Sequence, residues 1–124
     1  MQYKLVVISI LVCLLMACSK AVDVQLAPTV TAYISGAGEQ KLVLTAQDPA
    51  YQALNKWLST HTDGWYSTSG KYPGGVYLVS GEQGIQVTDT KVVLYTRINK
   101  SPQATHVYEI DKKTLAEVKR LANR

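Results

Sequence analysis

The chain has 124 residues, enough for one ordinary globular domain, and 47% of them are hydrophobic. It carries 13 basic and 9 acidic side chains, and the basic ones are scattered rather than clustered as in most nucleic-acid-binding proteins. The two cysteines, Cys13 and Cys18, lie close to the N-terminus. This composition excludes a disulfide-dense scaffold and gives no support for a nucleic-acid partner.

The first 17 residues have the pattern of a secretory signal peptide. Lys4 supplies a positive charge, and residues 5–17 are apolar apart from Ser9. This run is shorter than the about 20 residues that a helix needs to cross a bilayer core. A basic start, a short apolar stretch and a small residue before the cleavage site are typical of an exported protein. We therefore expect residues 1–17 to be removed.

The residues at this cleavage site, Leu15-Met16-Ala17-Cys18, resemble the lipobox of bacterial lipoproteins. In that family the signal is cut before the cysteine, and the cysteine thiol carries a lipid. The resemblance implies that Cys18 is the lipidated first residue of the mature chain. Residues 18–28 are short, lack periodicity and end in Ala27-Pro28, so they are predicted to form the lipidated N-terminus and a tether. Each buried acyl CH₂ contributes about 0.8 kcal/mol, so two or three chains attach a protein stably to a membrane.

Ser19 follows Cys18 where many lipoproteins of the inner membrane carry Asp. The resemblance therefore implies the inner leaflet of the outer membrane, facing the periplasm. The periplasmic face of the inner membrane and the cell surface are the alternatives. No cofactor is expected.

Residues 29–124 are predicted to form a single α+β domain. Alternation and β-branched residues predict strands at 29–34, 41–45, 76–80, 85–88, 91–98 and 105–110. These segments predict an antiparallel sheet of about four to six strands, with one central helix and a C-terminal helix packed on it. The first two strands form a hairpin that either joins this sheet or packs at its edge.

Asp48 and Pro49 open the clearest helical segment, with Asp48 at the N-cap and Pro49 at the first helical position. Its apolar stripe is Ala50, Leu54, Trp57 and Leu58, and Gly64 is expected to end the segment. Asp111 is expected to cap the C-terminal helix. The apolar stripe of that helix is Leu115, Val118, Leu121 and Ala122.

Residues 63–75 are rich in Gly and Ser yet carry large aromatic side chains. Such aromatics either pack down onto a core or stand out as a binding surface. The second interpretation makes this loop and the strand after it the best candidate for a partner-binding site. The candidate contact residues are Trp65, Tyr66, Tyr72 and Tyr77.

Candidates for chemistry are few. The two histidines, His61 and His106, have no metal-ligand spacing, and no metal site is expected. The stretch Gly36-Ala37-Gly38 lacks the third glycine of a dinucleotide fingerprint and reads as a hairpin turn. We therefore expect no enzymatic activity, with a small hydrolase as the weakest alternative.

Residues 51–58, Asp63-Gly64-Trp65 and residues 73–76 are similar to a helix–loop–strand segment of small uncharacterised bacterial lipoproteins. Lipoproteins of this size include inhibitors, immunity proteins and accessory subunits of envelope machines. The resemblance implies a non-enzymatic, membrane-anchored module that binds a protein in the periplasm. A structural or assembly lipoprotein, pairing through an open sheet edge, is the alternative.

Overall fold

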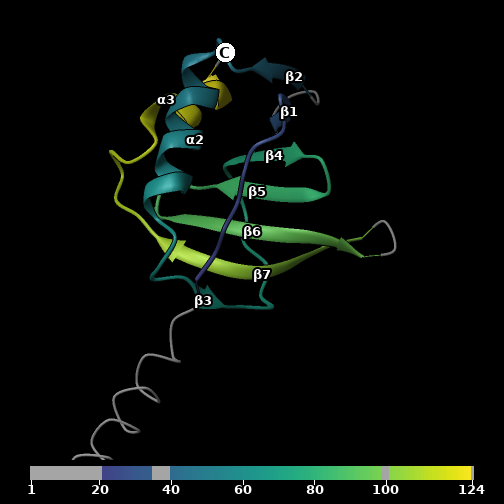
Figure 1. Ribbon diagram of the computed structural model, residues 1–124, viewed down its shortest axis with the longest axis vertical. Helices are drawn as coiled ribbons and strands as arrows, with labels where there is room; N and C mark the ends of the chain where they lie inside the picture. The colour runs from purple at the N-terminus through teal and green to yellow at the C-terminus, as the bar shows by residue number, and fades with distance from the viewer. Residues whose placement is uncertain (1–20, 35–39, 99–100, 124) are drawn as a thin grey trace, which may run out of the picture.

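The computed structural model describes residues 21–34, 40–98 and 101–123. The predicted signal peptide and the predicted lipidation site at Cys18 lie outside these residues. In chain order the elements (Figure 1) are β1 (Thr29–Ile34), β2 (Gln40–Thr45), α2 (Pro49–Thr60), β3 (Tyr66–Ser67), β4 (Val76–Ser80), β5 (Gln83–Val87), β6 (Lys91–Ile98), β7 (Ser101–Glu109), α3 (Ala116–Lys119) and the 3₁₀ helix η1 (Arg120–Asn123).

The strands form one antiparallel, seven-stranded sheet in the order β2-β1-β4-β5-β6-β7-β3. The prediction of four to six strands is therefore wrong. The first hairpin joins the sheet because β1 pairs with β2 on one side and with β4 on the other. The added strand, β3, has only two residues, Tyr66 and Ser67, which pair with β7. Two residues show no alternation, so the pattern did not separate this strand from a loop.

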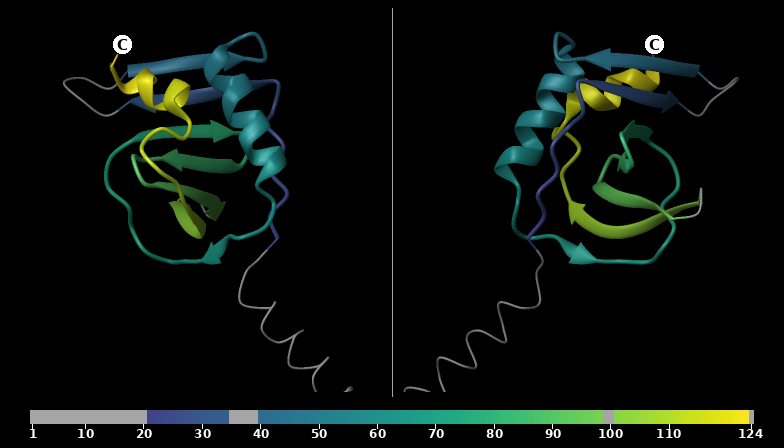
Figure 2. Two further views of the ribbon diagram at one scale, coloured as in Figure 1. Left: turned by 90° about the vertical axis from the view of Figure 1, so that its left-hand side faces the viewer. Right: turned by 45° about the vertical axis from the view of Figure 1, so that its right-hand side comes forward.

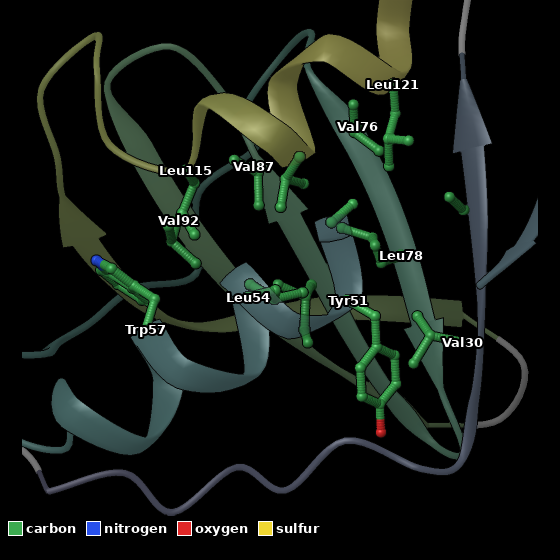
Figure 3. Packing of buried hydrophobic residues seen from close by; sticks show 14 of the residues in the cluster. Val30, Tyr51, Leu54, Trp57, Val76, Leu78, Val87, Val92, Leu115 and Leu121 are labelled. Carbon is green, nitrogen blue, oxygen red and sulfur yellow. The ribbon is translucent and has the colours of Figure 1, made fainter. Parts of the chain in front are cut away.

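One face of the sheet packs against α2 and forms the main core (Figures 2 and 3). Alternation along each strand points one set of apolar side chains to this face. Ile85 and Val87 share it, as predicted. The buried sheet residues of this core include Val30, Ala32, Leu44, Val76, Leu78, Ile85, Val87, Val92 and Leu94. The helix contributes Ala50, Tyr51, Leu54, Trp57 and Leu58.

Helix α2 begins at Pro49 with Asp48 at the N-cap position, as predicted. The Asp48 carboxylate does not cap the helix, however. It accepts the backbone N–H of Thr45 at 2.8 Å and so closes the turn that leads out of β2. The helix ends at Thr60, ahead of the predicted end at Gly64, because the next residue leaves helical backbone geometry.

The predicted C-terminal helix is shortened to α3 and η1, of four residues each. Asp111 closes a turn instead of capping a helix. Its carboxylate accepts the hydroxyl and the backbone N–H of Thr114 and the N–H of Lys113, and these bonds hold the pKa of Asp111 below its usual range. Leu115 then adopts a left-handed φ of 58°, which interrupts any longer helix.

The segment 21–28, predicted to be a tether, lies along the domain (Figure 1). The N–H of Val22 donates to the carbonyl of Thr62 at 2.7 Å. The N–H of Ala27 donates to Ser80 Oγ, and the Tyr51 hydroxyl donates to the Ala27 carbonyl, both at 2.7 Å. The alternate side chains that pack against the core are Val22, Val24 and Leu26. Any free tether therefore ends before Val22.

Candidate functional site

The sheet surface opposite α2 carries a continuous row of side chains across the strands. Tyr33 of β1 pairs with Tyr77 of β4, and Tyr77 pairs with Gln86 of β5. Residues opposed in an antiparallel ladder share a face of the sheet. The row therefore continues across β6, β7 and β3 through Val93, Val107 and Tyr66.

The neighbouring row contributes Gly84 of β5, which pairs with Tyr95 of β6. The chain between β3 and β4 passes on this side of the sheet, away from α2 (Figure 2), and brings Tyr72. We name this surface the tyrosine face and define it by the five tyrosines that lie on this side of the sheet. They are Tyr33, Tyr66, Tyr72, Tyr77 and Tyr95.

Three rings of the tyrosine face, those of Tyr33, Tyr77 and Tyr95, pack in a row. The centroids of Tyr33 and Tyr77 are 6.5 Å apart, and those of Tyr77 and Tyr95 are 5.5 Å apart at 70°. Both distances lie in the range favoured by aromatic pairs. Tyr33 is 41% exposed and Tyr66 is 57% exposed, whereas the other three are half-buried. The face thus offers aromatic area to solvent on a rigid support.

Gln86 connects the sheet to the loop that crosses it. This side chain is buried, and its amide nitrogen donates to the carbonyls of Tyr72 at 2.6 Å and Gly74 at 2.7 Å. Its amide oxygen accepts the hydroxyl of Tyr95 at 2.5 Å. Every polar atom of the Gln86 amide therefore has a partner, which fixes the loop in place.

Burial raises the pKa of the Tyr95 hydroxyl above its ordinary value, and the neighbouring Tyr77 and Tyr72 raise it further. Tyr95 therefore stays neutral at neutral pH and remains a hydrogen-bond donor to Gln86.

Two glycines allow the close approach of backbone and rings on this face. Gly75 has a φ of +82°, and a Cβ there would lie 2.8 Å from the carbonyl carbon of Val87. A Cβ on Gly84 would meet the hydroxyl of Tyr77 and lie 3.0 Å from Cβ of Tyr95. The Tyr77 ring therefore lies over Gly84, and the loop lies against the end of β5.

The predicted contact residues do not all lie on one surface. Tyr66, Tyr72 and Tyr77 belong to the tyrosine face. Trp65 is 0% exposed and lies in the main core, so its indole is closed to a partner. Successive side chains of an extended chain point to opposite sides, which separates Trp65 from Tyr66.

Trp65 belongs to an aromatic cluster beneath α2. Its indole N–H donates to the carbonyl of His61 at 2.6 Å. Its ring centroid lies 5.8 Å from that of Trp57 and 5.3 Å from that of Tyr108. This geometry corrects the prediction that Trp65 contacts a partner, and it assigns the side chain to packing.

The histidines occupy structural positions in the described part of the chain. His61 stacks on Trp57 with centroids 4.4 Å apart, and its Nδ1 lies 2.8 Å from the Trp57 carbonyl. Nδ1 of His106 lies 3.0 Å from the hydroxyl of Thr105. Within residues 21–34, 40–98 and 101–123, no carboxylate is bonded to either ring, and no group of three or more His, Cys, Asp or Glu is placed to hold a metal ion.

The described residues also contain no helix that is both long and apolar enough to span a membrane.

Sequence reasoning missed Tyr33, Tyr95 and Gln86. Tyr33 and Gln86 occupy the polar side of alternating strands and could have been identified from that pattern, whereas Tyr95 closes the apolar run Val92-Val93-Leu94. What the sequence did not contain was the register that aligns these positions across β1, β4, β5 and β6.

Comparison of the chain with protein-family models, with curated proteins and with solved structures gives no match.

Proposed function

We propose that this chain is a lipoprotein that is exported, lipidated at Cys18 and held at a membrane, where it binds a protein partner without catalysing a reaction. The signal-like residues 1–17 and the lipobox support the anchor. The proposed location is the inner leaflet of the outer membrane, facing the periplasm. An inhibitor-type or immunity-type role suits such a module.

The gathering of tyrosines on one rigid sheet face is the observation that carries the binding role. Tyrosine is enriched where proteins bind each other because a large ring with few rotatable bonds is immobilised at low entropic cost. Pairing through the sheet and the bonds of Gln86 hold this surface in shape before a partner arrives. Preorganisation of this kind favours affinity.

The docked segment 21–28 supports a short connection between the proposed lipid anchor and the domain. Val22 is bonded to Thr62, and four residues of extended chain span at most about 14 Å. A lipid on Cys18 would therefore hold the end of the domain that carries Thr62 close to the membrane surface.

Tyr33→Ala is the variant that tests the binding role, since Tyr33 is exposed and lies outside the main core. We expect it to reduce capture of the native partner from membrane extracts about tenfold, because tyrosine is enriched among the few interface residues whose truncation costs more than about 1 kcal/mol. The measurement is the yield of captured protein per mole of bait with an unchanged circular dichroism spectrum.

Gln52→Ala, on the exposed side of α2, is the matched control and is expected to capture as well as the native chain. Full capture by Tyr33→Ala, or an equal loss with Gln52→Ala, would contradict the proposal.

The edge of the sheet favours a second candidate, an assembly lipoprotein that pairs through β2. Within the described residues β2 pairs only with β1, and its six residues leave the opposite edge of the strand outside the ladder. Val43 on this strand is 60% exposed. Strand addition at such an edge relies on backbone hydrogen bonds. This candidate predicts that capture survives Tyr33→Ala.

A further inference from the structure

Residues 21–26 lie along the domain with little hydrogen bonding to it. They run from the end of the domain that carries β3 toward β1 (Figures 1 and 2). Within the described chain, the bonds that join them to the domain are those of Val22 and Leu26. The N–H of Val22 donates to the carbonyl of Thr62 at 2.7 Å, and the Tyr51 hydroxyl donates to the carbonyl of Leu26 at 3.4 Å. A paired strand of this length has a ladder of bonds, so these residues are held more weakly than the sheet.

The side chains of residues 21–26 alternate between the domain and solvent. Val22, Val24 and Leu26 are half-buried against the main core, whereas Asp23 and Gln25 are exposed. The three apolar side chains pack at the border of the core and are not among its fully buried members. Because the hydrophobic gain scales with the apolar area removed from water, each of them holds the chain less strongly than a fully buried side chain would.

Ala27 is the point at which the chain becomes firmly fixed. Its N–H donates to Ser80 Oγ and its carbonyl accepts the Tyr51 hydroxyl, both at 2.7 Å. Ser80 and Tyr51 are buried, so moving Ala27 would leave two buried polar groups without these bonds, which is costly. Strand β1 then begins at Thr29 and is paired on both sides. The chain from Ala27 onward therefore stays in place when the residues before it move.

The rest of the described fold does not depend on residues 21–26. The seven strands of the sheet pair with one another, and none of them pairs with this segment. The buried members of the main core all lie between Val30 and Leu121. Detachment of residues 21–26 would therefore be a local opening, of the kind that weakly held terminal segments undergo while the domain stays folded.

We propose that residues 21–26 form a releasable strap, which detaches from the domain as a unit and hinges at Ala27. The inference rests on the proposed function in one respect, since the strap lies between the proposed lipid on Cys18 and the domain. With the strap docked, the four residues from Cys18 to Val22 span at most about 14 Å. With the strap released, the nine residues from Cys18 to Ala27 span at most about 32 Å. Release would thus more than double the reach of the tyrosine face from the membrane toward a partner.

Hydrogen exchange followed by NMR, on the full chain in a nonionic detergent, tests the strap through the amide of Val22. This amide is bonded to Thr62 only while the strap is docked. After correction for intrinsic rates, we expect it to exchange about a hundredfold or more faster than the amides of Ala27 and β5, because the strap opens without global unfolding.

Two variants test whether the strap opens as a unit. Val24→Ala and Leu26→Ala should each speed exchange at Val22 about fivefold, because each removes apolar packing that holds the strap, and neither should change exchange in β5. Gln25→Ala, at an exposed position of the same segment, is the matched control and should leave all these rates unchanged.

Exchange at Val22 as slow as in β5 would overturn the inference, and so would exchange at Ala27 as fast as at Val22, which would remove the hinge. An unchanged rate at Val22 in Val24→Ala and Leu26→Ala would also overturn it, because the chain end would then fray without release of the strap. The mass of the N-terminal peptide separates this inference from the proposed function. A lipidated Cys18 with slow exchange at Val22 removes the strap and leaves the anchor, whereas an unmodified Cys18 with fast exchange does the reverse.

Discussion

Trp65→Ala is expected to lower the free energy of unfolding by about 3–5 kcal/mol, the usual cost of removing a large aromatic side chain from a core. Trp65 is 0% exposed, packs edge-on against Trp57 and also contacts Tyr108. The substitution leaves a cavity and removes the hydrogen bond to the carbonyl of His61. Urea denaturation followed by circular dichroism measures the change. Because a small domain is stable by only about 5–15 kcal/mol, part of this variant unfolds at physiological temperature.

Tyr66→Ala is the matched control, since it removes the adjacent aromatic ring from the exposed side of the chain. We expect a change within about 0.5 kcal/mol, as is usual for surface positions. A loss below about 1 kcal/mol for Trp65→Ala would contradict its assignment to the core. Loss of partner capture by Trp65→Ala would report unfolding, whereas the same loss by Tyr66→Ala would report a contact.

Gly75→Ala is expected to lower the free energy of unfolding by about 3 kcal/mol or more. A left-handed φ costs a residue with a Cβ about 1–2 kcal/mol. Here the new methyl group would also press on the backbone carbonyl of Val87, which a rigid strand cannot move aside. The displaced loop would pull the carbonyls of Tyr72 and Gly74 away from Gln86. Thermal and urea denaturation measure the loss.

Gly74→Ala isolates the contribution of the close contact. Gly74 has nearly the same φ, +84°, but nothing lies within 4 Å of a Cβ placed there. We expect a loss of about 1–2 kcal/mol from the backbone conformation alone. Equal losses for the two variants would show that the approach of the loop to β5 is not constrained as the structure indicates.

Local patterns predicted most of the strands and the start of the central helix. The strand predicted at residues 91–98 has the same bounds as β6, and α2 begins at Pro49 as predicted. These features depend on alternation and on the fixed φ of proline, which are local properties of the chain. Ile85 and Val87 share a buried face for the same reason.

Features that depend on pairing between distant segments could not be predicted from the sequence. β3 exists because Tyr66 and Ser67 meet β7, and the position of the loop after it depends on the amide of Gln86. Alternating apolar residues at 22, 24 and 26 were a readable signal that segment 21–28 packs against the domain. The burial of Trp65 follows from the same alternation that exposes Tyr66, because neighbouring side chains of an extended chain point to opposite sides.

In the C-terminal turn, local hydrogen bonds of an aspartate side chain shorten the helix that the apolar stripe predicts. Leu115, Val118 and Leu121 are buried, as predicted, whereas Ala122, which was predicted on the same stripe, is exposed. The carboxylate of Asp111, however, closes a turn onto Thr114, and the left-handed backbone of Leu115 limits the helical part. Aspartate side chains compete for backbone N–H groups in this way near turns.

Site-specific photo-cross-linking in living cells tests the central claim, that the tyrosine face is the binding surface. A photoreactive phenylalanine analogue replaces Tyr33 or Tyr66 on the tyrosine face, and Gln52 or Asn55 on the exposed side of α2. The proposal predicts an adduct of one defined mass from both tyrosine positions and none from the helix positions. Adducts from Gln52 or Asn55, with none from Tyr33 or Tyr66, would contradict it.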